Sequence, residues 1–125
     1  MIHLDTHVVI WLYTEQTRRI PRRGQEAIEV GPVAVSPMVE LELAYLAEIG
    51  RFADRPETVF TTLRTWLELQ VSTAPFTAVV REATRLTWSR DPFDRIIAAQ
   101  AVVDGAALLT ADTGMLEHLP SARWE

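Results

Sequence analysis

Short apolar runs alternate along this chain with longer segments in which apolar residues recur every three or four positions. The short runs predict buried strands, and the longer segments predict amphipathic helices. The predicted strands are Met1–Leu4, Val33–Val35, Gln70–Thr73 and Ala106–Thr110, followed by an edge strand in the tail that ends Arg123-Trp124-Glu125. The predicted helices are His7–Tyr13, Pro21–Val30, Pro37–Ile49, Pro56–Leu69, Phe76–Trp88 and Pro92–Asp104, with a short one after Asp112. This alternation is typical of an α/β fold with a mainly parallel sheet of four to five strands.

Residues at the predicted helix ends agree with these boundaries. Ser36 is a favourable N-cap, and Pro37 suits the first turn of the helix that follows it. Gly50 and Gly105 stand where two of the helices should stop. Asp104, just before Gly105, is expected to be solvated at the end of its helix.

Composition limits the class of protein. With 125 residues, 48% of them hydrophobic, and no repeat or linker, the chain is expected to form a single domain over residues 1–125. It has no cysteine, which excludes disulfides and thiolate metal sites, and no apolar run near the ~20 residues of a membrane span. We therefore expect a soluble cytoplasmic protein with no membrane partner. All twelve basic residues are arginine, and the net charge of −5 argues against broad adhesion to nucleic acid without excluding a nucleic-acid enzyme.

Three aspartates stand at positions where the pattern expects strand ends or helix starts. Asp5 directly follows the first predicted strand, and Asp112 follows the fourth by two residues. Ligands bind beyond the carboxyl ends of parallel strands, so both residues are expected at the functional edge of the sheet. Asp94 lies in the first turn of its predicted helix, and Asp91 is the better candidate for the N-cap. Each of the three also suits a helix start, so none of them identifies a site alone.

Glu42 is the acid that a structural role explains least well. A rotation of about 100° per residue places it on the apolar side of its helix, near the stripe that contains Val39, Leu43 and Leu46. An unpaired charge there is costly, so we expect Glu42 to bind a ligand or, alternatively, to pair with an arginine. Glu40 lies on the margin of the stripe and is the second choice as a ligand.

Polar neighbours of these acids are candidates for substrate binding. Thr6 is expected to donate either to a carboxylate or to substrate, and Thr6 or Thr110 to orient a water molecule. Arg95 is expected to pair with Asp94 or to hold a phosphate. A basic segment that is placed to meet a phosphate backbone includes Arg18 and Arg19. His7 is expected to be a satisfied histidine at a helix start, with contact to a substrate phosphate as the alternative.

A cluster of these carboxylates would need a cation. Two unit charges about 4 Å apart repel by roughly 4 kcal/mol at an effective dielectric constant near 20. Hard divalent cations such as Mg²⁺ or Mn²⁺ relieve this repulsion and prefer oxygen ligands. Aspartyl-phosphate chemistry is a weaker alternative, because the enzymes that use it pair a strand-end aspartate with an essential lysine and this chain has none.

The acids lie in ordered blocks of sequence. These blocks are Leu4-Asp5-Thr6-His7-Val8, Val35-Ser36 with Glu42 six residues after Ser36, Asp91-Pro92-Phe93-Asp94-Arg95 with Ile97-Ala98-Ala99-Gln100-Ala101, and Leu109-Thr110-Ala111-Asp112. In these blocks, and over almost its whole length, the chain resembles the PIN-domain family and, within it, the VapC-like toxin ribonucleases of type II toxin–antitoxin pairs.

The resemblance implies a three-layer α/β/α sandwich and metal-dependent cleavage of RNA phosphodiesters with Mg²⁺ or Mn²⁺. It assigns the catalytic, metal-binding role to Asp5, Glu42, Asp94 and Asp112. It also implies a homodimer that is inhibited by a cognate VapB-like antitoxin. Leu41 departs from related sequences, which often carry an aromatic residue before the acid, so both Glu40 and Glu42 stay open as the ligand. A non-catalytic PIN-like binding module is the alternative, although a degenerate copy should have lost one of the four acids.

Overall fold

A five-stranded sheet lies at the centre of the computed structural model, which describes residues 1–125 without a gap. Its strands are β1 (Ile2–Leu4), β2 (Val33–Val35), β3 (Leu69–Val71), β4 (Ala107–Leu109) and β5 (Ala122–Arg123). All neighbouring strands pair in parallel, in the order β3-β2-β1-β4-β5. The predicted parallel α/β sheet is therefore confirmed, and the tail supplies its edge strand.

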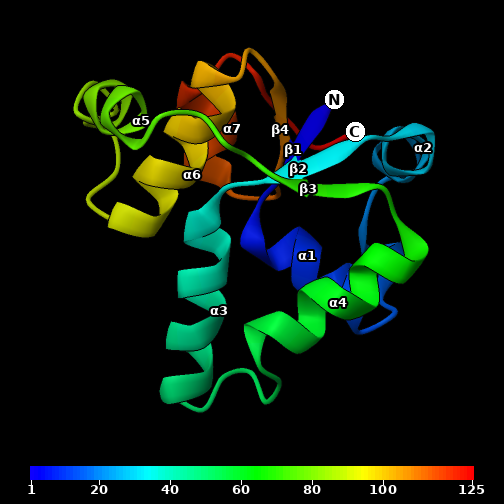
Figure 1. The fold of residues 1–125 in the computed structure, drawn as a ribbon. Coiled ribbons are helices and arrows are strands. Elements are labelled where there is room, and N and C mark those ends of the chain that lie inside the picture. Colours follow the sequence, from blue (N-terminus) through cyan, green and yellow to red (C-terminus); the bar gives the residue numbers. More distant parts are fainter.

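Helices cover both faces of this sheet. They are α1 (Thr6–Tyr13), α2 (Arg22–Val30), α3 (Pro37–Glu48), α4 (Pro56–Trp66), α5 (Phe76–Ala83), α6 (Pro92–Val103) and α7 (Thr113–His118). Figure 1 shows α1 and α4 below the strands, and α6 and α7 to their upper left. The three-layer sandwich implied by the resemblance is thus the fold of this chain. None of its helices combines the length and the apolar character that crossing a membrane requires.

Three local features differ from the sequence prediction. The helix predicted over Pro56–Leu69 ends at Trp66, and Leu69 is already the first residue of β3. The helix predicted to reach Trp88 ends at Ala83, because the Ala83 carbonyl does not continue the helical hydrogen-bond pattern. It accepts instead from Leu86 N at 3.1 Å and from Nε and Nη2 of Arg95 at 3.1 and 2.8 Å. A single turn of 3₁₀-helix over Thr17–Arg19 was not predicted, since three residues are too few to show a periodicity.

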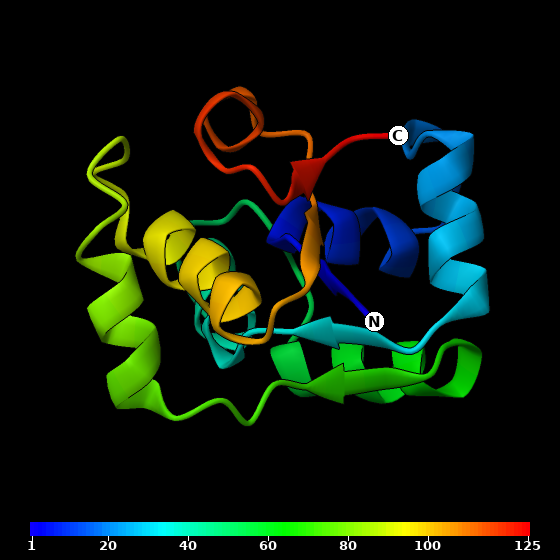
Figure 2. The same ribbon diagram turned by 90° about the horizontal axis from the view of Figure 1, so that it is seen from above.

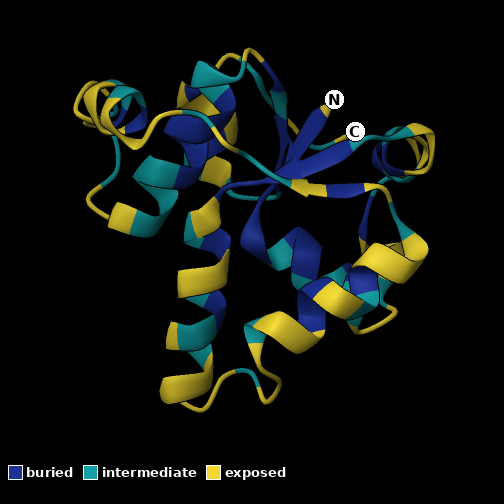
Figure 3. Cartoon of the chain, in the orientation of Figure 1, coloured by how far each residue is buried: buried dark blue, intermediate teal, exposed yellow.

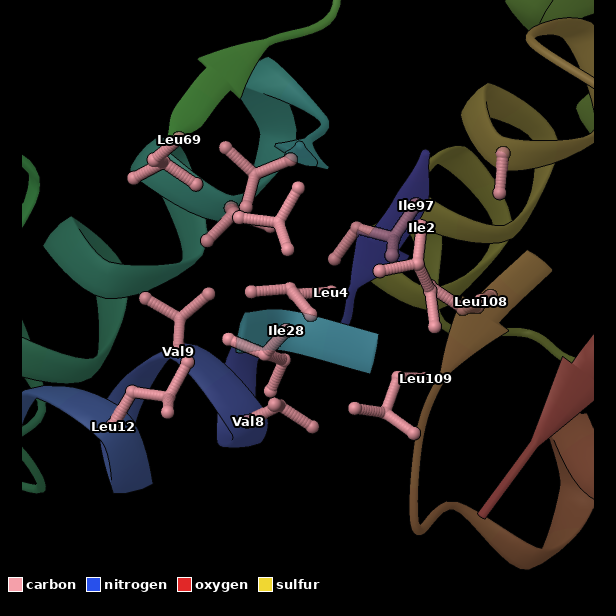
Figure 4. Close-up of a cluster of buried hydrophobic side chains, with 14 of the residues drawn as sticks. Ile2, Leu4, Val8, Val9, Leu12, Ile28, Leu69, Ile97, Leu108 and Leu109 are labelled. Atoms are coloured by element: carbon pink, nitrogen blue, oxygen red, sulfur yellow. The ribbon is translucent and has the colours of Figure 1, made fainter. Parts of the chain in front are cut away.

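The main hydrophobic core joins the sheet to the helices on both of its faces. Residues of β1 and β2 are buried throughout, as expected for parallel strands covered on both sides. Figure 4 shows side chains from β1, α1, α6 and β4 in this core, among them Leu4, Val9, Ile97 and Leu109. Figure 3 shows the strands largely buried and the outward faces of α3 and α4 exposed. This core fixes where each strand ends.

The strand order creates a switch point between β1 and β4. From β1 the chain builds β2 and β3 on one side, and then crosses to β4 on the other side of β1. The backbone N–H of Asp5 donates to the carbonyl of Leu109 at 3.1 Å, so the carboxyl ends of the two strands lie side by side. Ligands of open α/β sheets bind in the crevice at such a point.

A buried polar network links β1 to the segment after β3 and to α6. His3 Nε2 and Ser72 Oγ both lie within hydrogen-bond distance of Asp104 Oδ2, at 2.7 and 2.6 Å. Gln100 continues the network by donating to Ser72 Oγ at 2.9 Å and accepting from Ser36 Oγ at 3.1 Å. The prediction that Asp104 is solvated was therefore wrong, because its partners, His3 in β1 and Ser72 after β3, are distant in the sequence. Burial of the His3 ring lowers its pKa below the usual histidine value.

Candidate functional site

Asp5 occupies the gap between β1 and α1 and is 3% exposed. As the N-cap of α1, its Oδ1 accepts from Thr6 N at 2.8 Å, and its Oδ2 accepts from the Thr110 hydroxyl at 2.7 Å. Burial raises the pKa of the Asp5 carboxyl, although the nearby His7 and the two hydrogen bonds act in the opposite direction. The sequence left helix capping and participation in a functional site as alternatives for Asp5. In the structure Asp5 caps α1 and also lies near Asp112.

Asp112 lies on the loop after β4, beside Asp5. Its Oδ1 caps α7 by accepting from Met115 N at 2.9 Å, while its own backbone N–H donates to Thr110 Oγ1 at 3.0 Å. The charge of Asp112 contributes to the raised pKa of Asp5. A single threonine hydroxyl therefore joins the two strand ends that carry these aspartates.

Glu42 reaches the same place from α3. Its half-buried side chain accepts from Thr6 Oγ1 at 2.6 Å, and no arginine pairs with it. Burial raises the pKa of Glu42, and the charges of Asp5 and Asp91 raise it further. Glu40 is exposed and lines a surface hollow between α3 and α4 together with Glu57. The structure thus brings Glu42, and not Glu40, to the other acids.

Asp94 completes the group from the first turn of α6. Asp91 is the N-cap of this helix, as predicted, and accepts from Phe93 N at 2.8 Å. The pKa of Asp94 is raised to about 7, first by burial and then by the negative charges around it. These charges belong to Asp91, Asp5, Asp112 and Glu42. The four predicted acids therefore lie near enough for the charges of Asp5, Glu42 and Asp112 to act on Asp94, although they come from four separate parts of the chain.

The donors present fit a hard divalent cation. Every candidate ligand is a carboxylate oxygen, and the raised pKa values of Asp5, Glu42 and Asp94 reflect burial and repulsion that a bound cation would offset. No three carboxylate or imidazole groups lie close enough together to form a ready-made coordination shell.

The two threonines hold the acids rather than a water or a substrate. Thr6 Oγ1 donates to Glu42, and Thr110 Oγ1 donates to Asp5 while accepting from the backbone of Asp112. Both residues are buried, at 3% and 0% exposure. A hydroxyl has one proton to donate, and each of these protons is used within the protein. Thr6 and Thr110 therefore act as positioning residues in this structure, and for Thr6 this is the carboxylate alternative that the sequence left open.

The predicted basic residues have different environments. The Arg95 guanidinium donates to the Ala83 carbonyl and ties α6 to the end of α5, so the predicted pairing with Asp94 was wrong. Arg18 is exposed and makes no side-chain hydrogen bond or ion pair. Arg19 is exposed as well, but its Cζ lies 4.1 Å from the centre of the Trp11 ring.

His7 is more deeply involved than its sequence pattern indicated. Its Nε2 accepts from the backbone N–H of Ala111 at 2.8 Å, and its Nδ1 lies 3.8 Å from Asp5 Oδ2. An accepting Nε2 requires the neutral tautomer with the proton on Nδ1, and burial of the ring lowers the pKa of His7. His7 therefore holds the loop after β4 against α1, as a satisfied histidine. The only sequence signal for these contacts was that His7 lies two residues after Asp5.

The sequence profile of the PIN domain matches residues 2–120. This chain belongs to the PIN-domain family. The PIN domain described here is similar to ribonuclease VapC22 of Mycobacterium tuberculosis, with 30% identity over 122 residues that cover 92% of this chain and 89% of that protein. The family that the sequence blocks indicated is thereby confirmed.

Solved structures share the fold of this PIN domain. One is VapBC2 from Rickettsia felis bound to a DNA fragment from their promoter, with a TM-score of 0.66, 19% identity, and coverage of 100% of this chain and 98% of that chain. Another is a toxin–antitoxin complex from Klebsiella pneumoniae, with a TM-score of 0.67, 18% identity, and coverage of 98% and 96%. At 19% and 18% identity, the similarity establishes the fold and does not establish the chemistry.

Proposed function

We propose that this PIN domain is a metal-dependent endoribonuclease and the toxin of a toxin–antitoxin pair, acting on RNA in the cytoplasm. Its catalytic, metal-binding residues are Asp5, Glu42, Asp94 and Asp112. The observation that carries the proposal is the convergence of these four carboxylates at the switch point of the sheet, where their charges act on Asp94. Similarity to ribonuclease VapC22 over 92% of the chain supports the same reaction class.

The roles of the residues follow from their contacts. A bound Mg²⁺ or Mn²⁺ supplies Lewis-acid chemistry, since it lowers the pKa of a water molecule and offsets the charge that develops on the phosphate. Asp5 is held by Thr6 N and the Thr110 hydroxyl, and Glu42 by the Thr6 hydroxyl, so two ligands have fixed orientations. Asp94 has a pKa of about 7 without a cation and must release its proton to become a ligand.

Cleavage of total RNA tests this proposal. The wild-type protein with Mn²⁺ should cleave RNA, and Asp94→Asn should abolish cleavage while circular dichroism shows an unchanged fold. Undiminished cleavage in excess EDTA would refute the metal mechanism. The alternative, a binding module without turnover, predicts no toxicity on expression for either wild type or Asp5→Asn, whereas the ribonuclease predicts toxicity that Asp5→Asn removes.

A VapB-like antitoxin is the proposed protein partner. The solved structures that share the fold include VapBC complexes. A groove of about 320 Å³ on this chain is lined by apolar side chains of α1, α2 and α4, including Leu12, Ile28 and Leu63. Glu15 and Glu29 also line it, so the groove suits an antitoxin segment that combines apolar side chains with basic ones.

Homodimerisation is proposed from an exposed apolar surface on α3 and α5. Leu41, Tyr45 and Ile49 follow one another at intervals of four along α3 and its end, and are 56%, 44% and 46% exposed. Phe76 on α5 is 69% exposed and lines an apolar hollow with Leu41. Large contiguous apolar patches on a protein surface mark interaction sites. We propose that a second copy of the chain covers this one.

A further inference from the structure

Three aromatic rings stand beside the acidic site. Trp11 follows His7 by one turn of α1, and their ring centres lie 5.0 Å apart. Trp124 joins them from the C-terminal tail, with its ring centre 5.8 Å from that of Trp11 and 6.1 Å from that of His7. Figure 2 shows the C-terminus ending next to the segment that leads into α2. The cluster is therefore built from both ends of the chain.

Arg19 covers this cluster and is held there without an acidic partner. Its Cζ lies 4.1 Å from the Trp11 ring centre, and its Nη1 donates to Gln16 Oε1 at 3.3 Å. No carboxylate forms an ion pair with Arg19, whereas Arg22 pairs with Glu26 on α2 and Arg85, just after α5, pairs with Glu82. An exposed guanidinium that is stacked on a ring but lacks a counter-ion has its remaining N–H donors free for an anion.

The cluster touches the acidic site directly. The His7 ring lies against Asp5, with 3.8 Å between Nδ1 and Oδ2, and it is bonded to the loop that carries Asp112. A chain with a net charge of −5 and a group of neighbouring carboxylates repels a polyanion, and an exposed arginine beside that group offsets part of the repulsion.

We propose that Arg19, Trp11 and Trp124 form a nucleotide-binding subsite for single-stranded RNA beside the acidic site. The Arg19 guanidinium donates to the phosphate of a nucleotide that flanks the cleaved bond. The base of that nucleotide packs on the outer face of the guanidinium and on the half-buried ring of Trp124. An unpaired base is required, because bases in a duplex are already stacked. The inference rests on the proposed ribonuclease function and adds the residues that hold a nucleotide beside the cleaved bond.

Binding without cleavage tests the subsite. The Asp94→Asn protein in EDTA is titrated into a fluorescein-labelled single-stranded RNA oligonucleotide of mixed sequence, and anisotropy gives Kd. Adding Arg19→Gln should weaken binding by about ten-fold, in the range measured for the loss of a stacking contact. Arg19→Lys keeps the charge but loses the planar fork, so it should also bind more weakly than the parent. A duplex of the same sequence should bind more weakly than the single strand.

Matched controls come from α4. Arg64 is also an exposed arginine over an aromatic ring, with its Cζ 5.9 Å from the centre of Phe60, and Trp66 is 53% exposed. Arg64→Gln and Trp66→Leu should leave Kd within about two-fold of the parent, whereas Trp11→Leu should weaken binding. Thermal unfolding of each variant shows whether it is folded, and intrinsic fluorescence of a folded Trp66→Leu protein should still be quenched by RNA.

The outcomes separate the subsite from the catalytic proposal. Equal Kd values for Arg19→Gln and Arg64→Gln, wild-type affinity in Arg19→Lys, or no binding by the parent would each overturn the subsite. If the parent binds RNA through Arg19 but the wild type with Mn²⁺ cleaves none, the ribonuclease proposal fails and the subsite stands. If the wild type cleaves RNA and Arg19→Gln leaves KM unchanged, the subsite fails and the ribonuclease proposal stands.

Discussion

Thr110 donates its hydroxyl to Asp5 Oδ2 at 2.7 Å, although the two residues are 105 positions apart in the chain. The hydroxyl oxygen of Thr110 also accepts a hydrogen bond from the backbone N–H of Asp112, at 3.0 Å. One buried hydroxyl therefore sets the relation between the acid that follows β1 and the acid that follows β4. Such a bond between strand ends is possible because β1 and β4 are neighbours in the sheet.

Replacing Thr110 should impair metal binding more than folding. Thr110→Val leaves the buried Asp5 carboxylate without one donor, which raises its pKa further and lowers the affinity for Mn²⁺ at neutral pH. We expect at least about a ten-fold loss of RNA cleavage, and a loss of about 1–3 kcal/mol in unfolding free energy. Thr110→Ser keeps the hydroxyl and should restore most of the activity. Cleavage rates and urea unfolding measure the two effects, and equal activity of the Val and Ser variants would contradict the positioning role.

Glu42 and Glu40 form a matched pair on α3. Glu42→Gln removes the charge of a half-buried carboxylate that Thr6 orients, so cleavage with Mn²⁺ should fall by about a hundred-fold or more. Glu40→Gln changes an exposed side chain and should stay close to wild type. Single-turnover rates on one RNA substrate compare the two variants. A greater loss of cleavage in Glu40→Gln than in Glu42→Gln would show that Glu40 is the metal ligand.

The pKa of Asp94 links cation binding to pH. Its folded value of about 7 lies above the ordinary value of 3.8, so between these limits the folded protein holds a proton that the unfolded chain has released. Through this group, the unfolding free energy of the cation-free protein should fall as pH rises across that window. Mn²⁺ must displace the proton, so its affinity should increase with pH and level off above about pH 7.

Calorimetry measures this linkage. Titration of Mn²⁺ in buffers of different ionisation enthalpy should detect proton release below about pH 7 and little above it. Asp94→Asn is the control, since it cannot release that proton and should lose the Asp94 part of the pH dependence. An affinity for Mn²⁺ that stays constant across the window would rule out Asp94 as a ligand with a raised pKa.

The apolar surface on α3 and α5 predicts the oligomeric state. Tyr45→Arg places a charge in this surface and should shift the protein from dimer to monomer in light scattering coupled to size exclusion. Val30→Arg is the control, because Val30 is 83% exposed at the end of α2 and lies outside that surface. A monomeric wild-type protein, or a dimer that withstands Tyr45→Arg, would contradict the proposed interface.

Sequence patterns predicted the helices and strands well where the signal comes from residues that are close together in the chain. The predicted strands and helices are all present, because alternating apolar runs, Ser36 as an N-cap and glycines at helix ends act within a few residues. The prediction that the helix starting at Phe76 continues to Trp88 was wrong, and the reason is a contact with a distant part of the chain. The last carbonyl of this helix is taken by Arg95, which the fold brings from α6. Asp104 failed in the same way, since His3 reaches it only after β1 is placed.

The sequence by itself determined the parallel α/β sheet and the position of Asp5 and Asp112 at its carboxyl edge, because an acid within a few residues of the end of a buried parallel strand lies near that edge. Only the tertiary structure decided that Glu42 and Asp94 meet them, that Glu40 does not, and that both threonines orient carboxylates. These outcomes depend on how α3 and α6 pack at the switch point. Packing joins residues that are far apart in the chain, and no local pattern contains that information.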